Sequence, residues 1–170
     1  MARAFSDKVE ELIKGRHYEL ALALCDEELP SASSHAAARV WILRAHIHRA
    51  MGLSEQAVED ACKGLEVTPS NTALLFDRGL TLVEQGKFAA ALVDMRSVQQ
   101  IEAEGVWFGY AEVAGLFAVY CLLMMGRFSE CLVACESLES DTRWWIGGSL
   151  RTPVLIADEA RARLAAGHRP

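Results

Sequence analysis

Cysteine and histidine are the residues of this chain best suited to bind a metal ion, but their spacing forms no recognisable site. Cys131 and Cys135 are four residues apart, and Cys121 belongs to the preceding predicted helix. A structural zinc site takes four ligands, usually close cysteine pairs with a nearby histidine, and none of the five histidines is close in sequence. Cysteine also packs well as a small buried apolar side chain. We therefore expect buried thiols, no metal ion and no cofactor.

Catalytic motifs give no positive evidence for an enzyme. His46 and His48 are two residues apart, so on a helix they point in different directions and form no chelating pair. The chain has no Gly-rich phosphate loop after a strand, no Gly-x-Ser-x-Gly elbow and no His-Glu-x-x-His motif. Catalysis would need an unrecognised pocket, so we expect a binding protein that is not an enzyme.

The charge pattern argues against a nucleic-acid-binding protein. The net charge is −6, and lysine and arginine form no cluster, whereas neutralising phosphates requires a basic stripe. Five cysteines, an odd number without a disulfide framework, favour reduced thiols and a cytoplasmic location. The first residues carry acidic groups and lack the apolar stretch of a signal peptide.

One segment, residues 106–126, is apolar enough to raise the possibility of a membrane span, since Glu112 is its only charged residue. A span needs about 20 apolar residues. The uncharged part, residues 113–125, is shorter than this. We expect a helix buried by its neighbours and no membrane insertion.

Three similar turns set the organisation of the chain. Gly52, Gly86 and Gly126 each begin a turn that leads into a helix, and the second interval between them is slightly longer than the first. A period of about 34 residues is typical of stacked helix–turn–helix repeats. Small residues follow the same period, since Ala57 and Ala91 occupy the same position after the first and second turns. Such residues would let paired helices approach closely.

The apolar spacing and the turn residues predict a nearly all-helical chain. The expected helices cover residues 4–14, 17–28, 36–51, 54–67, 72–85, 88–101, 107–125 and 129–138. A polar, aromatic connector over residues 139–149 then leads to a last helix. Thr152 and Pro153 are suited to its N-cap and first turn.

Four segments resemble the tetratricopeptide repeat, a helical hairpin of about 34 residues with a defined pattern of small and aromatic residues. The second segment matches at Trp41, Ala45, Gly52, Ala57, Ala61 and Pro69. The third matches at Gly79, Gly86, Phe88 and Ala91. The fourth keeps Gly126 and Phe128 with Cys131 replacing alanine, and the first keeps Tyr18 and Ala21. Arg44 and His48 depart from the leucine and tyrosine of the pattern.

This resemblance covers residues 4–138 and implies an all-α fold. The expected architecture is a right-handed solenoid of helical hairpins, with three to four repeats and a C-terminal capping helix. The repeats would cover residues 4–30, 36–69, 72–103 and 107–138, and the capping helix residues 152–166. The whole chain, residues 1–170, would form a single domain.

The resemblance also implies a concave groove, lined by the first helix of each hairpin, that binds other proteins. Residues spaced three or four apart on those helices would point into it. The predicted groove residues are Arg39, Ile42, His46, Arg49, Phe76, Leu80, Val83, Leu116, Tyr120 and Leu123. Such a groove suits an amphipathic helix or an extended apolar segment that carries acidic residues. In the alternative, the last three residues pack against the apolar start of the C-terminal helix.

Many tetratricopeptide proteins hold the acidic C-terminal peptide of a chaperone through a clamp of lysine, arginine and asparagine residues. The corresponding positions here are Ser6, Glu10, Leu43, Ala73 and Asp77. None matches, and two are acidic where positive charge is needed. We therefore expect no binding of this kind.

Trp107, Trp144 and Trp145 form a second candidate surface. They either cap the last repeat or mediate self-association. The expected function is that of an adaptor or chaperone that holds a helical or extended peptide segment of another protein; chains of this length with three such repeats resemble small bacterial secretion chaperones. The alternative is an assembly subunit or a self-associating scaffold that forms homo-oligomers. The sequence does not identify the partner.

Overall fold

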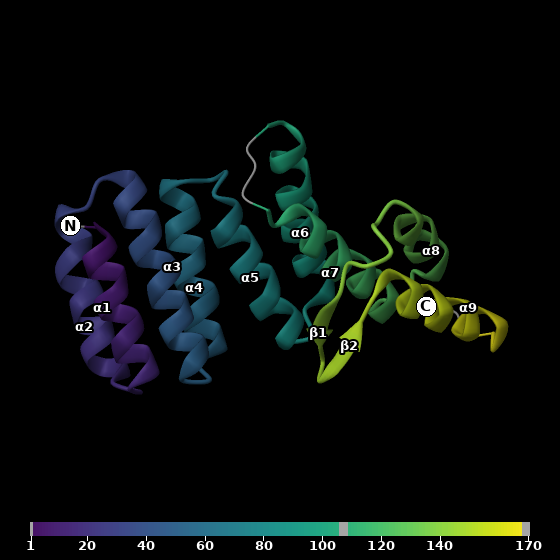
Figure 1. Ribbon diagram of the computed structural model, residues 1–170, viewed down its shortest axis with the longest axis horizontal. Coiled ribbons are helices and arrows are strands. Elements are labelled where there is room, and N and C mark those ends of the chain that lie inside the picture. The colour runs from purple at the N-terminus through teal and green to yellow at the C-terminus, as the bar shows by residue number, and fades with distance from the viewer. Residues whose placement is uncertain (1, 106–108, 168–170) are drawn as a thin grey trace. The chain divides into compact units, whose positions relative to one another are not determined.

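The computed structural model describes residues 2–105 and 109–167, and it confirms a mostly helical fold with packed neighbouring helices (Figure 1). The chain divides into two compact units, residues 1–81 and 82–170, here called the N-terminal and C-terminal units. The elements are α1 (Ala2–Lys14), α2 (Tyr18–Glu28), a short 3-10 helix (Leu29–Ser31), α3 (Ser34–Ala50), α4 (Ser54–Val67), α5 (Thr72–Glu84), α6 (Phe88–Ala103), α7 (Ala111–Met124), α8 (Phe128–Glu136), β1 (Trp144–Ile146), β2 (Ser149–Arg151) and α9 (Pro153–Ala165).

Four equivalent turns join the helices that the sequence pairs. In each turn one residue has a positive φ: Gly52 (78°), Gly86 (72°), Gly126 (75°) and, in the first turn, Arg16 (60°). The next amide donates to a carbonyl five residues earlier, at 2.8 to 2.9 Å: His17 to Leu12, Leu53 to His48, Lys87 to Leu82 and Arg127 to Leu122. This hydrogen bond satisfies a free carbonyl group at the end of the preceding helix. Helices commonly end in this way at a residue with positive φ, which is usually glycine. The first turn therefore has the same geometry although its glycine is displaced by one residue.

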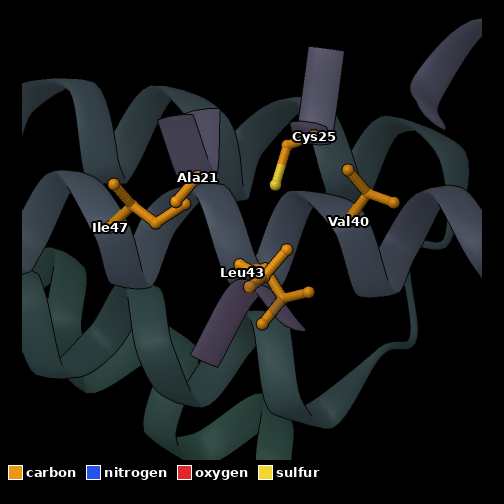
Figure 2. Close-up of a cluster of buried hydrophobic side chains, with 6 residues drawn as sticks. Ala21, Cys25, Val40, Leu43 and Ile47 are labelled. Atoms are coloured by element: carbon orange, nitrogen blue, oxygen red, sulfur yellow. The ribbon is translucent and has the colours of Figure 1, made fainter. Parts of the chain in front are cut away.

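The N-terminal unit buries its core between the first two helical hairpins (Figure 2). The fully or nearly fully buried side chains come from α1, α2 and α3: Val9, Ala21, Cys25, Val40, Leu43 and Ile47. Ala21 and Cys25 are four residues apart on α2, so their small side chains lie on one helix face and allow α3 to approach closely. Partly buried residues such as Phe5 and Tyr18 pack around this cluster.

In the C-terminal unit, the buried carboxylate of Glu102 caps the start of α7. Its oxygens accept hydrogen bonds from the amides of Tyr110, at 3.1 Å, and Ala111, at 3.0 Å. The first amides of a helix have no partner within the helix, so this carboxylate satisfies them and complements the helix dipole. The helix predicted over residues 107–125 begins instead at Ala111; residues 106–108 lie outside the described part.

Helix α7 is buried on nearly all sides, which explains its apolar sequence. Every residue from 114 to 123 is buried. Within residues 2–105 and 109–167, no helix has the length and apolar content needed to span a bilayer.

The connector after α8 contains an unpredicted β-hairpin. Strands β1 and β2 pair antiparallel, with Trp145 opposite Leu150 and Trp144 opposite Arg151. Gly147 and Gly148 form the two-residue turn, both with positive φ (59° and 78°), as the tightest hairpin turns require. Thr152 then caps α9 by accepting a hydrogen bond from the Leu155 amide at 3.2 Å, as the sequence predicted.

Helix α4 approaches α3 and α5 closely at Gly64, so a substitution of this glycine tests the packing. A Cβ atom on Gly64 would lie 2.7 Å from Leu74 Cδ1 and 2.9 Å from the Cβ of Trp41, which cannot move without its backbone. We expect Gly64→Ala to lower the free energy of unfolding by about 1–3 kcal/mol, although alanine is the better helix former. Chemical denaturation measures this, with the exposed Glu66→Ala in the same helix as the control. A gain in stability for Gly64→Ala would contradict the packing.

Candidate protein-binding surfaces

Helix α3 presents three different faces, and one of them stays partly accessible. Val40, Leu43 and Ile47 face the core that α1 and α2 share. Ala45 and His48 are also buried. The predicted groove residues of α3 form the third face and are all half-buried: Arg39, Ile42, His46 and Arg49. Their spacing of three and four residues puts them on one stripe of the helix.

Two side-chain contacts connect this stripe to the first helices of the adjacent hairpins. Arg39 Nη2 donates to Ser6 Oγ of α1 at 2.7 Å. His46 Nε2 lies 2.8 Å from Asp77 Oδ2 of α5, and these side chains are 38% and 15% exposed. The contacts bring α1, α3 and α5 together on one surface, here called the α3 face. Ser6 and Asp77 occupy two of the carboxylate-clamp positions, and both contact side chains of α3.

The other predicted groove residues are not equally accessible. In α5, Leu80 and Val83 are half-buried, whereas Phe76 is only 6% exposed. In α7, Leu116 and Leu123 are completely buried and Tyr120 is 8% exposed. These three residues therefore do not form an open surface.

Elements of the C-terminal unit cover Tyr120. Its ring makes an edge contact with Phe88 (centroids 6.1 Å apart), and the guanidinium of Arg151 lies over it at 5.6 Å. Helix α7 also packs against α9. The contacts that cover the Tyr120 ring thus come from α6 and β2, and the expected packing of this set against the apolar start of the C-terminal helix stays a prediction.

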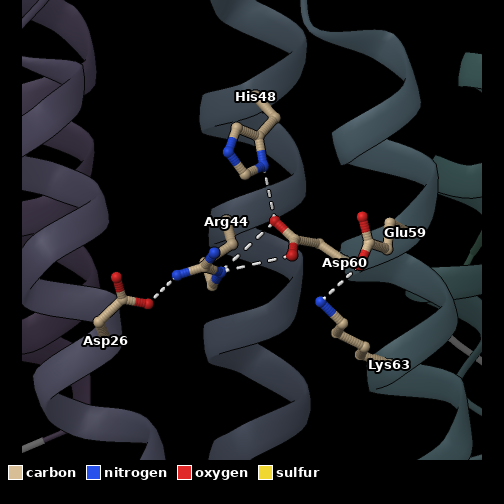
Figure 3. Close-up of polar contacts among 6 residues, drawn as sticks. All are labelled: Asp26, Arg44, His48, Glu59, Asp60 and Lys63. Atoms are coloured by element: carbon tan, nitrogen blue, oxygen red, sulfur yellow. Dashed lines mark hydrogen bonds and ion pairs between the residues drawn. The ribbon is translucent and has the colours of Figure 1, made fainter.

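A network of charged residues joins α3 to α2 and α4 (Figure 3). Asp60 of α4 is nearly completely buried, and its carboxylate lies 2.7 Å from His48 Nδ1 and 3.4 Å from Arg44 Nε. Arg44 also pairs with the exposed Asp26 of α2. A buried carboxylate requires such partners, because leaving it unpaired costs several kcal/mol.

The indole ring of Trp41 adjoins this network and makes cation–π contacts with two of its cations. Arg44 and Lys63 are 5.4 and 5.7 Å from its centroid. Lys63 pairs with Glu59 at 2.8 Å; their hydrogen bond lowers the pKa of Glu59 and raises that of Lys63. Because both groups are exposed, this pair contributes little to stability.

The network explains the two residues that depart from the repeat pattern. Arg44 and His48 replace leucine and tyrosine, and both contact Asp60. The sequence feature that could have indicated this contact is the pair of Arg44 and Asp60, because an arginine–aspartate pair recurs one repeat later as Arg78 and Asp94. On its own this recurrence predicts no contact, because the two residues of each pair belong to different helices.

The β-hairpin carries the second candidate surface. Trp144 makes an edge contact with Phe117 of α7, with ring centroids 6.4 Å apart, and remains 43% exposed. Trp145 and its cross-strand partner Leu150 are 68% and 42% exposed. The two tryptophans therefore differ: Trp144 packs on the helices, whereas Trp145 and Leu150 form an exposed apolar pair. Trp107 lies outside the described residues.

The three thiols considered for a metal site lie on two helices. Cys121 is buried in α7, and Cys131 and Cys135 lie on α8. Over the described residues, no three histidine, cysteine or acidic side chains are close enough together to hold a metal ion. Burial raises the pKa of Cys25 and of Cys121 to about 12, so these two thiols are protonated at neutral pH.

Comparisons with known proteins add no family assignment. No protein-family model matches the chain, and no curated protein is significantly similar to it.

The two aspartates that contact Arg44 provide a matched test of the network. Removing Asp60 leaves Arg44 and His48 without their buried partner, so Asp60→Ala should lower the free energy of unfolding by about 3–5 kcal/mol. Asp26 is 63% exposed, so Asp26→Ala should cost less than about 1 kcal/mol. Urea denaturation of both variants measures the difference. Equal effects would show that Asp60 does not organise the network.

Three acidic residues near the start of α7 give a pH-dependent prediction. The hydrogen bond between Glu139 and Glu112, with repulsion from Glu112 and Asp141, raises the pKa of the Glu139 carboxyl. Thr142 Oγ1 donates to Glu112 at 3.2 Å and holds that carboxylate in place. Because the folded chain binds this proton more tightly than the unfolded chain, ionised Glu139 opposes folding at neutral pH.

Glu139→Gln should therefore raise the melting temperature at pH 7. The advantage should shrink as the pH falls through the raised pKa towards the unfolded value of about 4.3, because wild-type Glu139 then becomes neutral as well. Thermal melts from pH 7 to pH 4 measure this, with the exposed Glu27→Gln of α2 as the control. If the gain in melting temperature from Glu139→Gln does not change with pH, the hydrogen bond between Glu139 and Glu112 is contradicted.

Proposed function

We propose that the chain binds a peptide segment of another protein on the α3 face of its N-terminal unit. The observation that carries the proposal is the alignment of Arg39, Ile42, His46 and Arg49 on one partly accessible stripe, connected to α1 and α5 by side-chain contacts. This is the surface that a tetratricopeptide-like repeat would use. The function is therefore binding, as an adaptor or chaperone, rather than catalysis.

The chemistry of the α3 face suggests what kind of segment it binds. Ile42 and Leu80 provide apolar contacts, and two arginines provide positive charge. Arg39 is oriented by Ser6, which reduces the side-chain entropy lost on binding. His46 is held by Asp77. An amphipathic helix or extended segment with apolar residues and acidic neighbours fits this combination.

The rigidity of α3 supports a role in recognition. Its other faces are fixed by the apolar core and by the hydrogen bonds of Arg44 and His48 to the buried carboxylate of Asp60. Binding residues on a rigid helix are already positioned before the partner arrives, so less ordering is needed on association.

The experiment combines partner capture with matched variants. Ile42→Asp with Leu80→Asp should abolish capture of the partner from a lysate, because both place a charge in the apolar part of the face. Leu20→Asp is the control, since Leu20 is a leucine of α2 that is already 60% exposed. Replacing Arg39 and Arg49 with glutamine should mainly slow association and weaken its salt dependence. Circular dichroism checks that every variant stays helical.

A second candidate function is self-association through the outer face of the hairpin. The observation that favours it is the exposure of the cross-strand pair Trp145 and Leu150 on a two-stranded sheet, in which both strands are edge strands. Trp145→Ser with Leu150→Ser would then reduce the mass seen by analytical ultracentrifugation. If capture survives the Ile42 and Leu80 changes but fails in this hairpin variant, the α3 face is not the binding surface.

A further inference from the structure

A small pocket between α8 and α9 contains a cysteine thiol. Its volume is about 170 Å³, and its walls include the apolar side chains of Leu132, Leu138, Val154 and Ala157. Cys135 also lines it, together with the polar side chains of Glu136, Ser140 and Arg161. An engineered apolar cavity of about 150 Å³ binds benzene, so this pocket has room for an aromatic ring or a short alkyl chain.

The neighbouring cysteine makes Cys135 the thiol that ionises first. Cys131 is completely buried, and with Cys135 neutral its Sγ donates to the Val119 carbonyl oxygen, 3.4 Å away. When Cys135 is ionised, the single S–H proton of Cys131 turns to the Cys135 sulfur instead. That hydrogen bond, with a smaller effect of the Arg161 charge, lowers the pKa of the Cys135 thiol, whereas the pKa of Cys131 is raised. A thiolate is the nucleophilic form of cysteine. The pocket therefore holds the more reactive of the two sulfurs.

The geometry disfavours two other uses of this cysteine pair. Residues four apart on a helix have Cβ atoms about 5–6 Å apart, whereas a disulfide needs about 3.5–4.5 Å, so oxidation to a disulfide would unwind α8. A stable metal site needs further ligands, and in the described part of the chain no third group is close enough. A small molecule in the pocket remains as the reaction partner for Cys135.

We propose that Cys135 is a modification site for small apolar α,β-unsaturated carbonyl compounds, which the pocket between α8 and α9 binds before they react. The sulfur, having lost its proton to solvent, attacks the β-carbon and forms a C–S bond. The π electrons of the C=C bond move to give an enolate. Arg161 lines the same pocket and adds positive charge near the enolate, although it also pairs with the exposed Asp158 at 2.8 Å. The enolate carbon then takes a proton from water, leaving a saturated thioether. The overall reaction adds one thiol to one C=C bond and needs no oxidant. It is independent of peptide binding on the α3 face.

The test compares two enones of different polarity on the native full-length chain. Phenyl vinyl ketone fits the apolar pocket, whereas acrylamide is polar and has no ring to bury. The rate of modification of each cysteine is followed by peptide mass spectrometry and divided by the rate of N-acetylcysteine, which corrects for intrinsic reactivity. We expect Cys135 to react first, and its preference for phenyl vinyl ketone to exceed that of N-acetylcysteine by about tenfold or more.

A pair of neighbouring variants separates pocket binding from simple thiol reactivity. Val154 lines the pocket and is 53% exposed, so Val154→Phe should fill the pocket without disturbing the fold. Leu155 is similarly exposed, at 49%, and Leu155→Phe is the control. We expect Val154→Phe to remove the preference for phenyl vinyl ketone at Cys135 and Leu155→Phe to keep it. The proposal is overturned if the half-buried Cys62 reacts first, if Cys135 shows only the preference of N-acetylcysteine, or if the preference persists in Val154→Phe.

Discussion

The buried carboxylate of Asp60 is the constraint on which the N-terminal unit depends. A nearly inaccessible charge must be paired, and Arg44 and His48 of α3 provide the partners. Satisfying Asp60 fixes both the rotation and the height of α3 against α4, because the two partners lie one helical turn apart. Arg44 extends the same constraint to Asp26 of α2. The core and the α3 face follow from this placement.

The same helix thus carries its structural contacts and the proposed binding stripe on different faces. Arg44 and His48 hold α3 against α4, whereas the stripe from Arg39 to Arg49 is half-buried and is the surface that we propose for a partner. In the C-terminal unit, α7 has no comparable accessible face over residues 114–123, since all of these residues are buried. Burial on this scale needs extra covering elements, which the hairpin and α9 supply. The accessible features of that unit include the exposed pair Trp145 and Leu150 and the pocket at Cys135.

The helices could be predicted because apolar periodicity and positive-φ turns are local signals. Helix α4 has the predicted bounds, Ser54–Val67, and Thr152 caps α9 as expected. The hairpin was missed because its strands have only three residues each, although Gly147 and Gly148 indicated a tight turn. Burial of Leu116 and Leu123 could not be predicted, because repeat register gives the direction of a side chain but not the element that covers it. The assignment of the repeats to the tetratricopeptide family remains a prediction.

Site-specific photo-crosslinking tests the central claim, that the α3 face is the surface that binds a partner. A benzophenone amino acid replaces either Ile42, on that face, or Leu20, which is exposed on α2. After irradiation in a lysate, the account predicts a discrete crosslinked partner band from position 42 and none from position 20. The same band from position 20, or a partner that crosslinks at position 145 but not at 42, would contradict it.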